Sequence, residues 1–206
     1  KVADDLFAPE VSDAQLTRAY ARMLVDRERE YLITTQHGER MSRLTRDSAF
    51  IEQVREALHQ LTGNDGYRLM NGWWAHQNIG LALPATNQQE VEAAAGHLIS
   101  AAARMRVLDL RRLEGPVDLF AALFGDKYRW TGEAPKIPGM NALFFLDGFG
   151  YGLDMVITHE AAELDWIRSL RDQCDGDGTA FHHLGGPLDG RIWDQLPYPS
   201  MLGGNA

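Results

Sequence analysis

The chain is poor in cysteine, in positive charge and in long apolar runs, and each shortage excludes a class of protein. Cys174 is the single cysteine among 206 residues, so these residues form neither an internal disulfide nor a self-contained thiolate cluster. Basic residues number 20 against 29 acidic ones, and the resulting net charge of −9 disfavours a surface that coats nucleic acid. Because no apolar run reaches membrane-spanning length and nothing resembles a signal peptide, we expect a cytoplasmic protein without membrane contact.

The composition that is present suits one hydrophobic core. At 206 residues, with 45% hydrophobic and 24% charged residues, the chain is long enough to bury a substantial interior. We therefore predict a single α/β domain over residues 1–206. Residues 126–140, rich in Gly and Pro, are expected to be a loop insertion, and residues 187–206 an irregular C-terminal tail.

Helical and strand patterns alternate along the chain. Apolar spacing predicts helices over 12–25, 39–44, 49–61, 90–103 and 166–174, and a short helix toward Phe124. Ser12 is a suitable cap for the first of these, and Gly63 ends the third. Strands are predicted over 31–35, 78–83, 105–110, 141–146 and 179–183. This alternation predicts a mainly parallel sheet, and about five strands make a partial or degenerate TIM-barrel-like fold, short of the eight that close a barrel.

Two histidines end the last predicted strand. His182 and His183 would lie at the carboxyl edge of the sheet, where barrels and doubly wound sheets bind and react. An imidazole there can bind a metal or move a proton, although neighbouring strand residues point to opposite faces, so only one can face a site. No second ligand stands at metal spacing, and a structural role is the simpler interpretation. The segment from His159 to Glu163 resembles half of a zinc-binding helix motif, with Glu163 where a second histidine would be needed. A polar entry into the helix at Trp166 is the simpler interpretation.

Two further groups of residues are candidates for binding. Arg111 and Arg112 could hold a phosphate or a carboxylate, or could form surface ion pairs with Asp109 and Glu114. Three tryptophans stand in the longest loops, where aromatic residues either anchor a partner or cover the end of an incomplete barrel; these are Trp73, Trp74 and Trp130.

Short blocks along nearly the whole chain resemble, in the right order, the landmarks of one family. The blocks are Asp5-Leu6-Phe7, Glu39-Arg40-Met41, residues 78–83 with Asn87-Gln88, Gly115-Pro116-Val117-Asp118-Leu119, residues 166–174, and residues 188–191 with Trp193-Asp194. The chain is similar to a phage-associated family of radical-SAM-like proteins of uncharacterised function. Full-length members begin with a three-cysteine motif and neighbour the three-Cys-motif partner proteins. The block over 166–174 is the most specific part of the resemblance.

The departures from this family concern its chemistry. A cluster that activates S-adenosylmethionine needs three thiolates, which Cys174 alone cannot supply. A lysine of the family is lost near Gln36 and His37, a Glu-Pro pair is replaced by Arg111-Arg112, and His182 stands where a lysine is usual. The resemblance thus favours a non-catalytic phage or prophage homologue that acts as a protein-binding or structural component, with a protein partner or a second copy and without metal or cofactor. If phage-encoded, it would work in the host cytoplasm.

An enzyme is the alternative interpretation. The chain could be the later part of a radical-SAM-like enzyme whose iron–sulfur segment lies outside these residues, or a repurposed small-molecule or nucleotide enzyme. In the second case His37, Asp109 and His182 would be the catalytic candidates and would converge on one pocket. Gln36, Arg111 and His183 would be the candidates for ligand binding.

Overall fold

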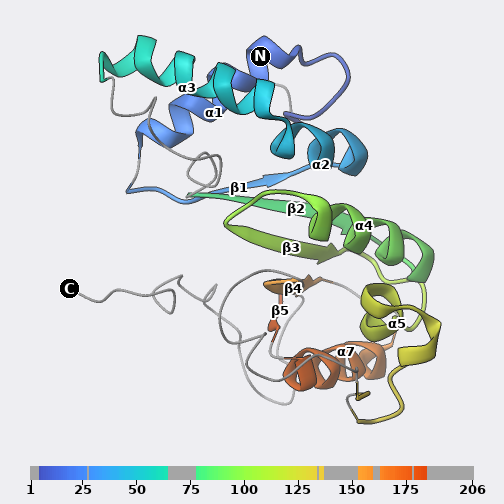
Figure 1. Ribbon diagram of the computed structural model, residues 1–206. Coiled ribbons are helices and arrows are strands. Elements are labelled where there is room, and N and C mark those ends of the chain that lie inside the picture. The colour runs from blue at the N-terminus through green and yellow to red at the C-terminus, as the bar shows by residue number, and fades with distance from the viewer. Residues whose placement is uncertain are drawn as a thin grey trace. The chain divides into compact units, whose positions relative to one another are not determined.

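A computed structural model of the chain describes residues 5–26, 28–64, 78–133, 135–136, 153–159, 163–177 and 179–184. Helices and strands alternate along it (Figure 1). The strands are β1 (Tyr31–Thr34), β2 (Ile79–Ala85), β3 (Met105–Leu110), β4 (Met155–Thr158) and β5 (Ala180–His183). The helices are α1 (Asp13–Val25), α2 (Gly38–Arg46), α3 (Ser48–Thr62), α4 (Gln88–Ser100), α5 (Leu119–Phe124) and α7 (Leu164–Asp177), with a 3-10 turn, η3 (Asp126–Tyr128).

The five strands follow one another in the sheet in chain order, β1-β2-β3-β4-β5. The pairs β1–β2 and β4–β5 are parallel, with Tyr31 opposite Ile79 and Thr158 opposite His183. Chain order without reversal is the order of a barrel and differs from that of doubly wound sheets. Among the described residues β1 and β5 are edge strands, so the sheet is open. The prediction of an α/β, partial barrel-like fold is confirmed.

The chain divides into two compact units that interleave in sequence. The first unit comprises residues 1–84 and 100–107, and the second comprises residues 85–99 and 108–206. Each is described separately below. The single domain over 1–206 stays a prediction.

In the first unit α1 packs along α3. Ser12 caps α1 as predicted, since Gln15 N–H donates to Ser12 Oγ while Ser12 N–H donates to Gln15 Oε1. Tyr20 lies in the core between Phe7 and Phe50, with edge-to-face ring contacts at 6.2 and 5.4 Å, and burial raises the pKa of its hydroxyl. Gly63 ends α3 in the left-handed conformation at φ 65°, which glycine adopts without strain.

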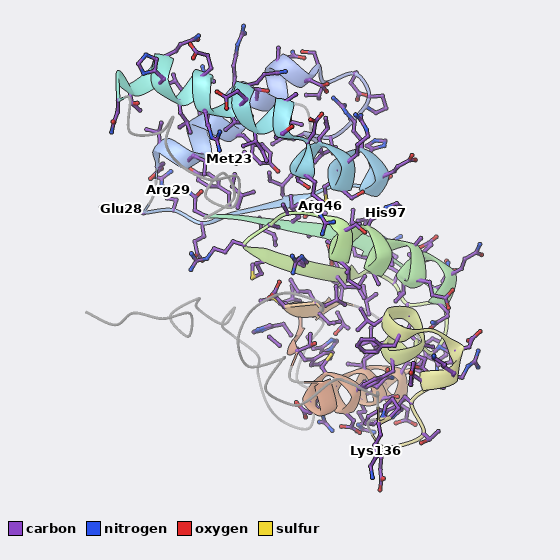
Figure 2. All side chains as sticks on the ribbon, viewed as in Figure 1. Met23, Glu28, Arg29, Arg46, His97 and Lys136 are labelled. Carbon is purple, nitrogen blue, oxygen red and sulfur yellow. The ribbon has the colours of Figure 1, made fainter. Side chains whose placement is uncertain are left out.

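Asn78 joins β2 to the turn between α1 and β1. Its buried amide nitrogen donates to the carbonyl oxygens of Met23 at 2.9 Å, Asp26 at 3.2 Å and Arg29 at 3.0 Å. Figure 2 labels Met23, which lies in the last turn of α1, and Arg29, which lies in the turn before β1. The side chain thereby satisfies backbone carbonyls that the end of a helix would otherwise leave without partners.

In the second unit α5 packs against α7, and α7 packs against β5. The core is mainly aliphatic, and its wholly or almost wholly buried members include Leu108, Leu110, Met155, Val156, Ile167, Leu170 and Cys174. The thiol of Cys174 is buried inside this core, as its place on the apolar face of the helix predicted. No helix among the described residues has the length and apolar character needed to span a membrane.

The elements differ from the prediction mainly at β4. Residues 155–158 form this strand, which the sequence did not predict, and His159 therefore follows a strand and does not stand on a helix. The predicted strand over 141–146 and the tail over 187–206 lie outside the described residues. Residues 134 and 137–140 of the predicted loop over 126–140 also lie outside them. The described part of that loop contains η3.

Candidate functional site

Polar side chains of the second unit gather where β3, β4 and β5 end. Asp109 is the penultimate residue of β3, His159 directly follows β4, and His183 ends β5. The carboxyl ends of parallel strands share one edge of a sheet, which is the edge where barrels keep their chemistry. We call Asp109, Arg111 and His159 the edge cluster.

Asp109 and Arg111 form the first half of the edge cluster. Asp109 Oδ2 accepts a hydrogen bond from Arg111 Nε at 2.7 Å and forms an ion pair with Arg111 Nη2 at 2.6 Å. The carboxylate side chain is 7% exposed, whereas the arginine side chain is 54% exposed. The pairing neutralises a carboxylate that burial would otherwise penalise, and it leaves the other side of the guanidinium toward solvent.

His159 forms the second half. Its Nε2 lies 2.8 Å from Asp109 Oδ1, so both carboxylate oxygens are engaged, and the imidazole side chain is 35% exposed. A carboxylate only accepts hydrogen bonds, so Nε2 carries the proton and donates. The neutral ring then presents Nδ1 as an acceptor, and the charged ring presents Nδ1–H as a donor.

His182 and His183 are both buried in β5. His183 Nδ1 lies 3.0 Å from Thr158 Oγ1 of the neighbouring strand. Burial lowers the pKa of both imidazoles, and the charge of His159 lowers that of His183 further. The interior thus favours neutral rings at both positions.

Gln36 and His37 lie in the first unit and have a different partner. Asp5 Oδ2 accepts hydrogen bonds from Thr35 Oγ1 at 2.9 Å and from Gln36 N–H at 3.0 Å, and lies 3.9 Å from His37 Nε2. Asp109, Arg111, His182 and His183 belong to the second unit. The convergence of His37 with Asp109 and His182 on one pocket stays a prediction.

Of the three loop tryptophans, Trp73 and Trp74 lie outside the described residues. Trp130 is half-buried, and its ring stacks on Phe120 with centroids 5.6 Å apart. Its backbone N–H donates to Asp118 Oδ2 at 2.9 Å. It lines a pocket of about 330 Å³, together with Gln88, Asp118, Arg129 and Ser169. This volume is at the lower end of the range for small-molecule sites.

In the second unit, the landmark blocks of the sequence resemblance contact one another. Gln88 Oε1 accepts from Asp118 N–H at 2.7 Å, and Gln88 Nε2 donates to Asp118 O at 3.2 Å. Gln173 Oε1 accepts from Leu119 N–H at 2.7 Å, and its Nε2 donates to Val117 O at 2.9 Å. The blocks around residues 88, 115–119 and 166–174 are thus connected by hydrogen bonds, in which side chains of the first and third hold the backbone of the second in place.

In the first unit the landmark blocks likewise contact each other. Arg40 donates to the carbonyl oxygens of Phe7, Ala8 and Val11, and pairs with Asp13 at 2.6 Å. Asp5 Oδ1 accepts from Phe7 N–H at 2.9 Å. The contacts give structural roles to the blocks at residues 5–7 and 39–41.

His159 is the site residue whose role the sequence did not reveal. Its partner Asp109 is 50 residues earlier in the chain, and such a pairing has no local signal. The nearby Glu160 and Glu163 suggested a helical zinc motif instead. Only the prediction of a strand over 155–158 would have placed His159 at the carboxyl edge.

The iron–sulfur cluster that the resemblance implies does not fit these residues. Cys174 is the single thiol in the sequence and is wholly buried in α7. In the described segments no three or more His, Cys, Asp or Glu residues are arranged to hold a metal ion. No step through such a cluster is therefore derived from this donor set.

The fold and the edge cluster define an open, parallel α/β protein of barrel-like strand order with a polar carboxyl edge. The family model described as "Protein of unknown function (DUF5131)" matches residues 2–197. The chain belongs to this family. Neither a curated protein nor a solved structure matches it significantly.

Proposed function

We propose that this chain is a non-catalytic phage or prophage homologue of a radical-SAM-like barrel protein, acting as a protein-binding or structural component. The observation that carries the proposal is the state of Cys174, the one thiol of these residues, which is enclosed in the core of the second unit. A buried thiol on an apolar helical face packs as a small hydrophobic side chain. Residues 1–206 contain no set of three thiols that could hold a cluster, which supports the proposal.

The landmark blocks support the same proposal. Their side chains hold backbone segments together through Gln88, Gln173 and Arg40, which supports an architectural role for the residues that carry the resemblance. The pocket beside Trp130 offers an aromatic wall with polar neighbours, a composition typical of contact surfaces. A protein partner or a second copy of the chain is the proposed occupant of such surfaces.

The proposal is tested by attempting the reaction that it excludes. The protein is purified and reconstituted anaerobically with iron and sulfide, beside a radical-SAM enzyme treated identically. We expect no bound cluster in the absorption spectrum, and no 5′-deoxyadenosine from S-adenosylmethionine under reductant. A stoichiometric cluster or cleavage of S-adenosylmethionine would overturn the proposal. Sedimentation velocity over a range of concentrations then tests whether the partner is a second copy.

A repurposed enzyme is the second candidate function, and the pairing of Asp109 with His159 favours it. A buried carboxylate that orients a partly exposed imidazole is an arrangement used for general base catalysis. Chromogenic phosphate and carboxylate esters test this candidate. Hydrolysis by the native protein that disappears in His159→Gln, and persists in the His97→Gln control, would favour the enzyme over the non-catalytic homologue.

A further inference from the structure

The edge cluster directs hydrogen-bond donors outward. Arg111 donates to Asp109 from Nε and forms an ion pair with it through Nη2, so both N–H groups of Nη1 remain available on a side chain that is 54% exposed. His159 Nε2 donates a hydrogen bond to the same carboxylate, so Nδ1 is the ring nitrogen that an incoming group can contact. Asp109 thus fixes the orientation of a guanidinium and an imidazole at neighbouring positions of the edge.

The edge cluster carries a net positive charge when His159 is protonated, and this charge favours an anion. The charges of Arg111 and Asp109 cancel, and the carboxylate is buried beneath its two partners. His159 adds a positive charge when protonated, and only then can both of its ring nitrogens donate. His183 is neutral by preference, because burial and His159 both lower its pKa.

The loop after β3 supplies a second, independent observation. Arg112 has φ 53°, and among the described residues it is the only non-glycine with positive φ. The left-handed conformation costs an arginine about 1 kcal/mol. Two backbone bonds hold the loop in it, from Arg111 N–H to Ala85 O at 3.1 Å and from Glu114 N–H to Thr86 O at 2.9 Å. Backbone held against its preference concentrates at ligand sites.

We propose that the edge cluster is a binding site for an oxyanion, the carboxylate or phosphate group of a small molecule, held by Arg111 and by protonated His159. Asp109 is the positioning residue, since it orients both donors without touching the ligand. A planar guanidinium matches both kinds of oxyanion. The site goes beyond the proposed function, because oxyanion binding requires neither a protein partner nor a cluster.

Titration calorimetry at low ionic strength tests the site in the full chain. Inorganic phosphate and succinate are the two probes, and sodium chloride is the control for unspecific charge screening. Saturable binding of one probe per chain supports the site, and the tighter probe identifies phosphate or carboxylate as the ligand class. Heats that do not saturate with either probe, or that chloride reproduces, overturn the proposal.

Proton linkage distinguishes a ligand role of His159 from a structural one. Neutral His159 presents an acceptor at Nδ1, so binding of an anion at this nitrogen requires the ring to take up a proton. Within the described segments, the titratable and charged groups recorded around this ring are Asp109, Arg111 and His183. We expect the binding heat to depend on the ionisation enthalpy of the buffer, and this dependence should vanish in His159→Gln. Binding without proton uptake would contradict the assignment of His159.

Variants of the arginine complete the test. Arg111→Gln should weaken binding about tenfold or more, since a charge-assisted hydrogen bond contributes at least this factor. Arg111→Lys keeps the charge that balances Asp109, and should recover folding and part of the affinity if Arg111→Gln is poorly folded. Arg168→Gln, a comparably exposed arginine paired with Asp165 in α7, is the matched control and should bind as the native protein does. Equal weakening by Arg168→Gln would overturn the proposal. The proposed function would still stand in that case if the iron–sulfur reconstitution gave no cluster, because that assay does not depend on anion binding.

Discussion

The side-chain oxygen of Gln173 in α7 accepts a 2.7 Å hydrogen bond from the backbone N–H of Leu119, 54 residues earlier in the chain. Its amide nitrogen donates to Val117 O at 2.9 Å, and the residue is 2% exposed. One amide thus satisfies both a donor and an acceptor of the segment that precedes α5. Because this segment lines the pocket beside Trp130 and Gln173 lines it too, the two hydrogen bonds hold this wall of the pocket in place.

Removal of the Gln173 amide is predicted to destabilise the second unit. Gln173→Met keeps the length of the side chain but leaves the N–H of Leu119 and the carbonyl of Val117 buried without a partner, at a cost of about 2 to 4 kcal/mol. Urea unfolding followed by circular dichroism measures the loss. Gln60→Met, on the exposed face of α3, is the control and should change stability by less than about 0.5 kcal/mol. Equal losses in the two variants would contradict the structural role of Gln173.

Asn78→Asp is predicted to destabilise the turn between α1 and β1 in a pH-dependent way. The substitution turns a donor into a buried carboxylate oxygen that faces three carbonyl oxygens, which we expect to cost at least about 3 kcal/mol at neutral pH. A protonated carboxyl can donate one of the lost bonds. The loss relative to the native protein should therefore shrink as the pH falls toward about 4, where an unfolded aspartate titrates. Asn64→Asp, at an exposed position, is the isosteric control, and an equal pH dependence there would refute the explanation.

Two serine-to-alanine changes should have opposite effects. Ser12→Ala removes the cap of α1 and should cost about 1 kcal/mol. Ser42 lies inside α2, where its hydroxyl donates back to Glu39 O, a bond that competes with the helix. Ser42→Ala should therefore be neutral or stabilise by a few tenths of a kcal/mol, about the difference in helix propensity. Thermal unfolding of both variants checks the signs, and a loss of stability in Ser42→Ala would show that its hydroxyl has another role.

The buried histidines of β5 predict a loss of stability in mild acid. Their pKa values are lowered in the folded chain, so the unfolded chain binds more protons once the pH falls below about 6.5. The free energy of unfolding should be highest above this value and should decrease below it, until the folded rings also titrate. A double variant, His182→Leu with His183→Asn, should show a smaller decrease between about pH 7.5 and about pH 5.5 in urea unfolding. His97→Asn is the control, and a double variant with the native pH profile would disprove the assignment.

The sequence predicted the elements that have regular apolar spacing or a clear residue at which a helix begins or ends. The helix from Asp13 to Val25 has a serine cap and a regular apolar face, and Gly63 ends α3 where its left-handed conformation is needed. The strand over Met105–Leu110 was predicted with its observed bounds. These signals are local, because capping and apolar spacing act within a few residues.

The sequence predicted only part of the edge cluster, because the remaining contact joins residues that are far apart in the chain. Arg111 and Asp109 are two residues apart, and their pairing was among the alternatives that the sequence offered. The strand β4 is four residues long and buried throughout, so it shows no alternation of apolar and polar residues that would mark it. Without this strand His159 could not be placed beside Asp109, since only the sheet brings the two together.

Strand β3 also limits how the molecule can be divided for experiments. Residues 100–107 belong to the first unit and residues 108–110 to the second, so the boundary passes through the strand. A fragment that ends at residue 84 would lose the hydrogen bonds from Ala102 N–H to Thr45 Oγ1 and from Arg104 N–H to Ile79 O. Neither unit is a continuous stretch of chain. Proteolysis at one site or a simple truncation therefore releases no intact unit, and the two must be studied by point substitution in the whole protein.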